Sequence, residues 1–99
     1  MVLEVARIRI AHGAEAAFEA AVAEAAPLFR RARGCRSMAL RRSVEAPDCY
    51  VLIVDWATLE DHTEGFRNSR DFEAWRALVS PHFAAPPEVE HLDAVAEHF

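Results

Sequence analysis

The stretch "VLIVDWATLEDHTEGF", residues 51–66, contains the transition that decides the fold. Four apolar residues and an aspartate lead to Trp56, which is a run typical of a buried strand. Thr58 then offers a side-chain oxygen as a helix N-cap, and Asp61 follows at the spacing of a capping box. The stretch therefore predicts a strand that passes directly into a short helix ending near Phe66.

Both faces of this strand are largely apolar. Tyr50, Leu52, Val54 and Trp56 share one face, whereas Val51, Ile53 and Asp55 share the other. A strand that is apolar on both sides has to be covered twice, once by helices and once by something else. Since the chain has only 99 residues, a second copy of it is the simplest second cover.

The segments before this strand are a strand over residues 2–10 and an amphipathic helix from residue 14 to about residue 33. The apolar residues of the helix recur at intervals of three and four: Phe18, Val22, Ala25, Phe29 and Ala32. Pro27 predicts a kink or break within the helix, and Gly34 predicts its end. Residues 35–44 and 49–57 then form a predicted hairpin around the turn "EAPD".

After the short helix, Ser69 is a predicted cap for a second helix that runs to about Val79 and is ended by Pro81. An extended, proline-rich connector leads to a last strand over residues 89–95. The predicted order β-α-β-β-α-β is that of an α+β, ferredoxin-like split sandwich. We expect a single domain over residues 1–99 and a homodimer.

Composition and charge exclude several classes of function. The net charge of −5 disfavours a nucleic-acid partner, and the basic cluster at residues 30–36 lies where cations complement a helix dipole. No apolar run approaches the roughly 20 residues that a membrane span needs, and no signal-peptide pattern is present, so a cytoplasmic location is expected. Neither the two cysteines nor the five histidines have metal-site spacing, and no metal is expected.

The segment from Tyr50 to Val95 resembles the antibiotic biosynthesis monooxygenase domains. Those domains show an aromatic-rich strand ending in Trp, a short helix, a Phe near an Asn-Ser break, a second helix and a proline-rich lead into the last strand. The resemblance implies a dimeric α+β barrel. It also implies oxidation of a small aromatic phenol or quinol to a quinone by O₂, without metal, flavin or any other cofactor.

The resemblance also points to residues. Trp56, His62 and Arg76 lie at positions implicated in the quinone-forming members, and we expect them to be catalytic. In that branch an Asn and a Tyr flank the Trp, whereas this chain has Leu52 and His62 there. A histidine can still act as a base near neutral pH. On the helical wheel, His62 flanks the apolar stripe and Arg76 falls inside the stripe of its own helix.

The predicted pocket is lined in addition by apolar side chains of Leu52, Phe66 and Phe72, which would bind the substrate. Three other interpretations stay open: a small-ligand-binding dimer, a structural dimer, and an isomerase of a small oxygenated metabolite. Trp56 and His62 could be core residues, and Arg76 could be paired with a carboxylate. Heme degradation is disfavoured, because the positions of the Trp and axial His of that branch hold Phe66 and Trp75.

Overall fold

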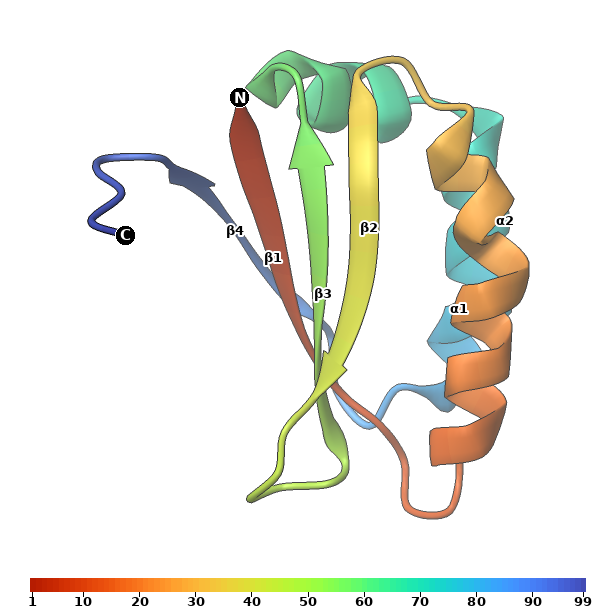
Figure 1. Cartoon of the computed structure of the whole chain (residues 1–99). Coiled ribbons are helices and arrows are strands. Elements are labelled where there is room, and N and C mark those ends of the chain that lie inside the picture. The colour runs from red at the N-terminus through yellow and green to blue at the C-terminus, as the bar shows by residue number, and fades with distance from the viewer.

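A computed structural model describes all of residues 1–99 and has the predicted order of elements (Figure 1). The elements are β1 (Val2–Arg9), α1 (Glu15–Arg30), β2 (Cys35–Arg42), β3 (Cys49–Trp56), the π-helix η1 (Asp61–Phe66), α2 (Arg70–Val79), the 3₁₀ turn η2 (Ser80–His82) and β4 (Glu88–Asp93). The strands form one antiparallel sheet in the order β2-β3-β1-β4. The predicted ferredoxin-like α+β fold is confirmed.

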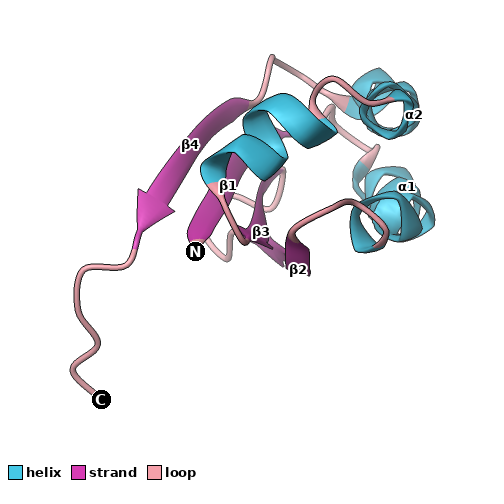
Figure 2. Cartoon of the chain, turned by 90° about the horizontal axis from the view of Figure 1, so that it is seen from above, coloured by secondary structure: helices cyan, strands magenta, loops and turns pink.

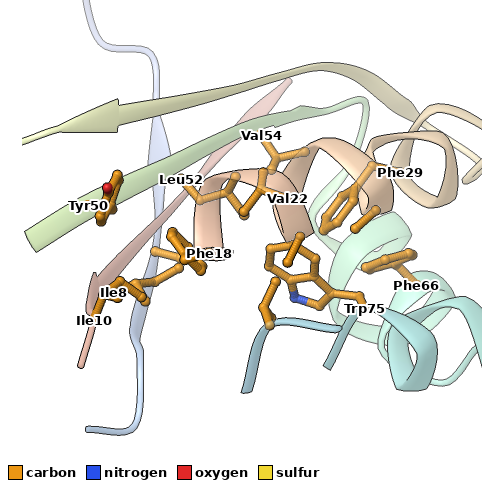
Figure 3. Packing of buried hydrophobic residues seen from close by; sticks show 14 of the residues in the cluster. Ile8, Ile10, Phe18, Val22, Phe29, Tyr50, Leu52, Val54, Phe66 and Trp75 are labelled. Carbon is orange, nitrogen blue, oxygen red and sulfur yellow. The ribbon is translucent and has the colours of Figure 1, made fainter. Parts of the chain in front are cut away.

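The two α-helices lie side by side on one face of the sheet and leave the other face bare (Figures 1 and 2). The core lies between these layers, where Phe18 of α1 meets Tyr50 of β3 edge to face at 5.0 Å (Figure 3). Further along α1, Phe29 contacts Trp75 of α2 at 4.9 Å between ring centroids. The aromatic side chains of α1 therefore hold both α2 and the sheet in place.

The alternation predicted for β3 is present. The inward side chains Tyr50, Leu52, Val54 and Trp56 are each at most 2% exposed. On the bare face, Val51 and Ile53 are half-buried, and Asp55 Oδ1 is a buried atom without a hydrogen-bond partner. The outer face of the sheet thus combines apolar area with an unsatisfied acceptor.

The helix α1 differs from its prediction at its C-terminal end. Pro27 does not break it, because the helix continues to Arg30 and the Pro27 carbonyl still accepts a bond from Arg31 N at 3.2 Å. The helix also ends three residues before the predicted end at Arg33. Gly34 has a φ of +80° and turns the chain into β2, and a Cβ atom there would lie 2.8 Å from Asp61 Cβ.

The two predicted caps after β3 are present. Thr58 Oγ1 accepts a hydrogen bond from Asp61 N at 3.1 Å, and Ser69 Oγ accepts one from Phe72 N at 3.2 Å. The short helix that Thr58 precedes is a π-helix, a type that was not predicted. Its wider turn is visible in the bond from Arg67 N to the His62 carbonyl at 3.0 Å. None of the helices combines the length and hydropathy that crossing a bilayer would take.

Candidate functional site

A cavity of about 540 Å³ lies between the sheet, η1, α2 and the connector that follows α2. Ala6, Ile8 and Leu52 line it from the sheet, and Phe72 and Trp75 from α2. The connector completes the wall with residues 83–87. This volume lies within the range of roughly 300–1,000 Å³ found for small-molecule sites, and its lining is mostly apolar as in those sites.

A buried carboxylate borders the cavity at its η1 end. Glu4 points inward from β1 and is only 5% exposed. Its Oε1 accepts a hydrogen bond from Trp56 Nε1 at 3.0 Å, and the same oxygen lies 3.3 Å from His62 Nε2. The register of the sheet explains the first contact, since Glu4 faces Val54 on β3 and Trp56 lies two residues further on the same face.

His62 is held on three sides. Its ring stacks on Trp56 with 5.2 Å between centroids and 17° between planes. Its Nε2 faces Glu4, and its Nδ1 lies 2.7 Å from His91 Nε2. His91 reaches this position because it pairs with Glu4 across the β1–β4 ladder. Glu4, His62 and His91 therefore form a continuous row of close polar contacts.

Burial sets the protonation of this row. Burial raises the pKa of Glu4, although the Trp56 hydrogen bond and the charge of Arg67 oppose the rise. Burial lowers the pKa of His62 to about 4, and the charges of Arg67 and His91 add to this effect. The pKa of His91 is also lowered, by burial first and by Arg67 second. Both imidazoles are consequently neutral near neutral pH.

The structure brings together four of the six predicted site residues. His62, Arg76, Leu52 and Phe72 all line the cavity. Arg76 is exposed, so it does not lie within the buried stripe of α2, and it makes no ion pair with a carboxylate. Its guanidinium is thus available to a ligand.

The other two predicted residues lie behind the cavity wall. Trp56 is fully buried and contacts the site only through Glu4 and His62. Phe66 is 3% exposed, lies among the rings of Phe29, Trp56 and Phe72, and does not border the cavity. Both support the residues that line the site instead of lining it themselves.

Sequence reasoning missed Glu4, Arg67 and His91. Glu4 could have been found, because it shares the parity of the inward residues Ala6 and Ile8 and is the one carboxylate on that face of β1. His91 lies on the same face of its strand as Val89. Its contact with His62, 29 residues away in sequence, could not be predicted from that pattern. The position of Arg67 at the cavity depends on the π-turn of η1. Because the π-helix was not predicted from the sequence, neither was this position.

The arrangement can transfer a proton and hold an anion. A carboxylate and an imidazole in contact, both shielded from water, can accept a proton from a ligand in the cavity. Two arginines that make no ion pair, Arg67 and Arg76, also line the cavity and can attract a negative charge. No group of three or more His, Cys, Asp or Glu side chains is arranged to hold a metal ion. Glu4 and His91 contact opposite ring nitrogens of His62, so the three side chains do not converge on one point where an ion could be held.

Comparisons with known proteins agree on a family. The family model described as antibiotic biosynthesis monooxygenase matches residues 1–78. The uncharacterized protein YczJ of Bacillus subtilis is 41% identical over 95 residues, which cover 96% of this chain and 100% of YczJ. A crystal structure from Bordetella bronchiseptica that carries the same family name is 53% identical, covers 96% of this chain and 97% of its own, and has a TM-score of 0.94.

A more distant structure shares the fold alone. SnoaB from Streptomyces nogalater, described as a cofactor-independent oxygenase, has a TM-score of 0.84 at 24% identity, with 97% of this chain and 94% of SnoaB covered.

Proposed function

The chain belongs to the antibiotic biosynthesis monooxygenase family, and from this premise we propose that it is a cofactor-independent monooxygenase of small aromatic phenols or quinols. The observation that carries the proposal is the buried Glu4–His62 pair at the edge of an apolar cavity of about 540 Å³. SnoaB, described as a cofactor-independent oxygenase, offers a precedent for oxygenation without a cofactor on the same fold.

The reaction needs little from the protein beyond a base, an anion site and exclusion of water. A phenol with hydrogen on its para carbon loses its hydroxyl proton and becomes an electron-rich phenolate. The phenolate gives one electron to O₂, and the two radicals combine to a peroxide at the para carbon. Loss of the carbon-bound hydrogen with cleavage of the O–O bond then gives a quinone and water. One oxygen atom enters the product and the other is reduced to water, so no external reductant is consumed.

Each predicted residue has a role in this scheme. The Glu4–His62 pair takes the hydroxyl proton. Arg76, together with Arg67, stabilises the negative charge that develops on the phenolate oxygen. Leu52 and Phe72 contact the ring, while Trp56 holds Glu4 and His62 in position from behind. Phe66 keeps the outer side of Trp56 filled.

We also propose a homodimer formed through the bare face of the sheet. Val51 and Ile53 give this face apolar area, and the buried Oδ1 of Asp55 has no partner within one chain. A second copy would cover the apolar residues and bring donors to the oxygen. The cytoplasmic location expected from the sequence stays a prediction.

Oxygen consumption tests the proposed activity. Purified protein is mixed with a panel of polycyclic phenols, each with hydrogen on the carbon para to the hydroxyl, in metal-chelated buffer, and O₂ uptake is followed with an electrode. We expect His62→Ala to lower kcat/KM by about 100-fold or more, because general base catalysis contributes at least that much. Arg76→Ala should lower it by about tenfold or more through loss of the anion contact.

Two variants outside the cavity serve as matched controls. His12→Ala removes an exposed histidine in the turn after β1, and Arg70→Ala removes an exposed arginine at the start of α2. Both should retain the activity of the parent. Absence of O₂ uptake with every substrate, or equal losses in site and control variants, would refute the proposed activity. Thermal stabilisation by aromatic ligands without O₂ uptake would instead favour a ligand-binding protein.

A further inference from the structure

The row of Glu4, His62 and His91 leads from the cavity to the edge of the sheet. Glu4 and His62 border the cavity, with side chains that are 7% and 3% exposed. His91 does not border the cavity and is half-buried on the edge strand β4. The row therefore joins a group shielded from water to one that water reaches.

Two arrangements of protons satisfy every contact in this row. If Glu4 is ionised, His62 donates Nε2–H to Glu4 Oε1 and accepts at Nδ1 from Nε2–H of His91. If Glu4 is protonated, Glu4 donates to His62 Nε2, and His62 donates Nδ1–H to Nε2 of His91. In both cases each imidazole carries one proton and is neutral, and His91 keeps its Nδ1 for water. The arrangement with protonated Glu4 holds one proton more. Uptake of that proton from water at His91 Nδ1, with a shift of one proton across each contact of the row, converts the first arrangement into the second.

We propose that His62 and His91 form a proton relay that connects Glu4, the terminal proton acceptor of the cavity, to solvent. On release, the O–H bond of Glu4 breaks as Nε2–H of His62 forms. Nδ1–H of His62 breaks as Nε2–H of His91 forms, and Nδ1–H of His91 passes to water. Uptake uses the same bonds in reverse.

The relay matches the proton balance of the reaction proposed above, and to that extent it rests on the proposed function. Ionisation of the phenol produces one proton, and formation of water from the departing peroxide oxygen consumes one. One release and one uptake per turnover return both imidazoles to their starting tautomers. The relay thus lets a buried carboxylate exchange protons without opening the cavity to water.

Few other charged groups act on the row. Arg67, at the end of η1, influences Glu4, His62 and His91 and favours the anionic form of Glu4. The thiol of Cys35, at the start of β2, responds to the charge of Glu4. Trp56 on β3 is uncharged; it donates its N–H to Glu4 and stacks on the ring of His62.

Histidine tautomers measured by long-range ¹H–¹⁵N NMR test the relay without any substrate. In the parent protein, His62 and His91 should change together from the Nε2–H to the Nδ1–H form as the pH falls through the raised pKa of Glu4. In Glu4→Gln the side-chain oxygen accepts the hydrogen bond from Trp56 N–H and carries no proton of its own. The same oxygen can therefore accept a hydrogen bond from His62 but cannot donate one. His62 should then stay in the Nε2–H form throughout. Fixed tautomers in the parent, or changes at different pH values for the two rings, would overturn the relay.

A kinetic test adds a readout that a structural role for His91 would not move. In His91→Gln the row ends at His62, so O₂ uptake should fall by about tenfold or more and should be restored by added imidazole buffer. His98→Gln, which changes an exposed histidine near the C-terminus, should behave like the parent in both respects. Loss of activity that no buffer restores would overturn the relay.

The two tests separate the relay from the proposed function. Coupled tautomers in a protein that oxidises no phenol would support the relay and refute the oxygenase. Oxygen uptake in a protein whose tautomers are uncoupled would support the oxygenase and refute the relay.

Discussion

Replacement of Trp56 by phenylalanine is the sharpest test of how the site is held together. Trp56 is fully buried and donates its only polar hydrogen to Glu4 at 3.0 Å. Trp56→Phe keeps an aromatic ring but leaves the buried carboxylate without this donor. A hydrogen bond to a charged group contributes about 1.5–3 kcal/mol, so the free energy of unfolding should fall by about 2 kcal/mol beyond the loss of packing.

The loss of packing is measured with Trp75→Phe. Trp75 lies in the same core and is 8% exposed, but its indole N–H makes no hydrogen bond. Urea unfolding followed by circular dichroism should show Trp56→Phe to be less stable than Trp75→Phe by about 2 kcal/mol at about pH 8. For a domain of this size, that difference corresponds to a Tm lower by about 10 °C.

Acid provides the second half of this test. Once Glu4 is protonated, the bond from Trp56 joins two neutral groups and contributes only about 1 kcal/mol. Because burial raises the pKa of Glu4, the excess destabilisation of Trp56→Phe should shrink to about half as the pH falls through that raised pKa. Equal stability of the two variants at pH near 8, or an excess that does not change with pH, would refute the reasoning.

Three further predictions concern the framework of the site. Gly34→Ala should destabilise the fold by about 2–4 kcal/mol in urea unfolding, because it adds a clash with Asp61 to the cost of a left-handed backbone. Gly13→Ala, with a φ of +84° and open space around it, should cost only about 1 kcal/mol, and equal costs would refute the clash. The unfolded chain protonates His62 near its ordinary pKa, whereas the folded chain does so only at about 4. The stability of the parent relative to His62→Gln should hence fall by up to about 3 kcal/mol from about pH 6.5 to 4, and a constant difference would contradict the shielding of His62. Ile53→Glu should convert a dimer to a monomer in light scattering with the same circular dichroism, and an unchanged mass would exclude the bare face as the interface.

The fold could be predicted from the sequence because the patterns that indicate it involve residues close together in the chain. The alternation of β3, the caps at Thr58 and Ser69 and the apolar stripe of α1 each depend on residues a few positions apart. The end of α1 was less accessible. Pro27 favoured a kink or break, but the helix continues to Arg30 although Pro27 has no N–H to donate.

The site was only partly accessible, because its contacts join distant strands. His62 and Arg76 could be placed at the cavity, since the segments that carry them were predicted to be helical. The row that contains His62 depends instead on the β1–β4 register, which sets Glu4 against His91 and has no local signature. A carboxylate on the apolar face of a strand was the one sequence signal for it, because such a group is rarely buried without a partner.

The π-helix makes this site sensitive to chain length. A π-turn accommodates one more residue than an α-turn, so η1 behaves like an α-helix with a single inserted residue. Deletion of one residue between Asp61 and Phe66 would restore ordinary turns and rotate the preceding side chains by about 100° relative to those that follow. In homologues, a histidine aligned with His62 would therefore face the carboxylate only where the segment between Trp56 and Phe66 has the same number of residues. A search for this site in homologues should therefore compare the number of residues in this segment as well as the residue types.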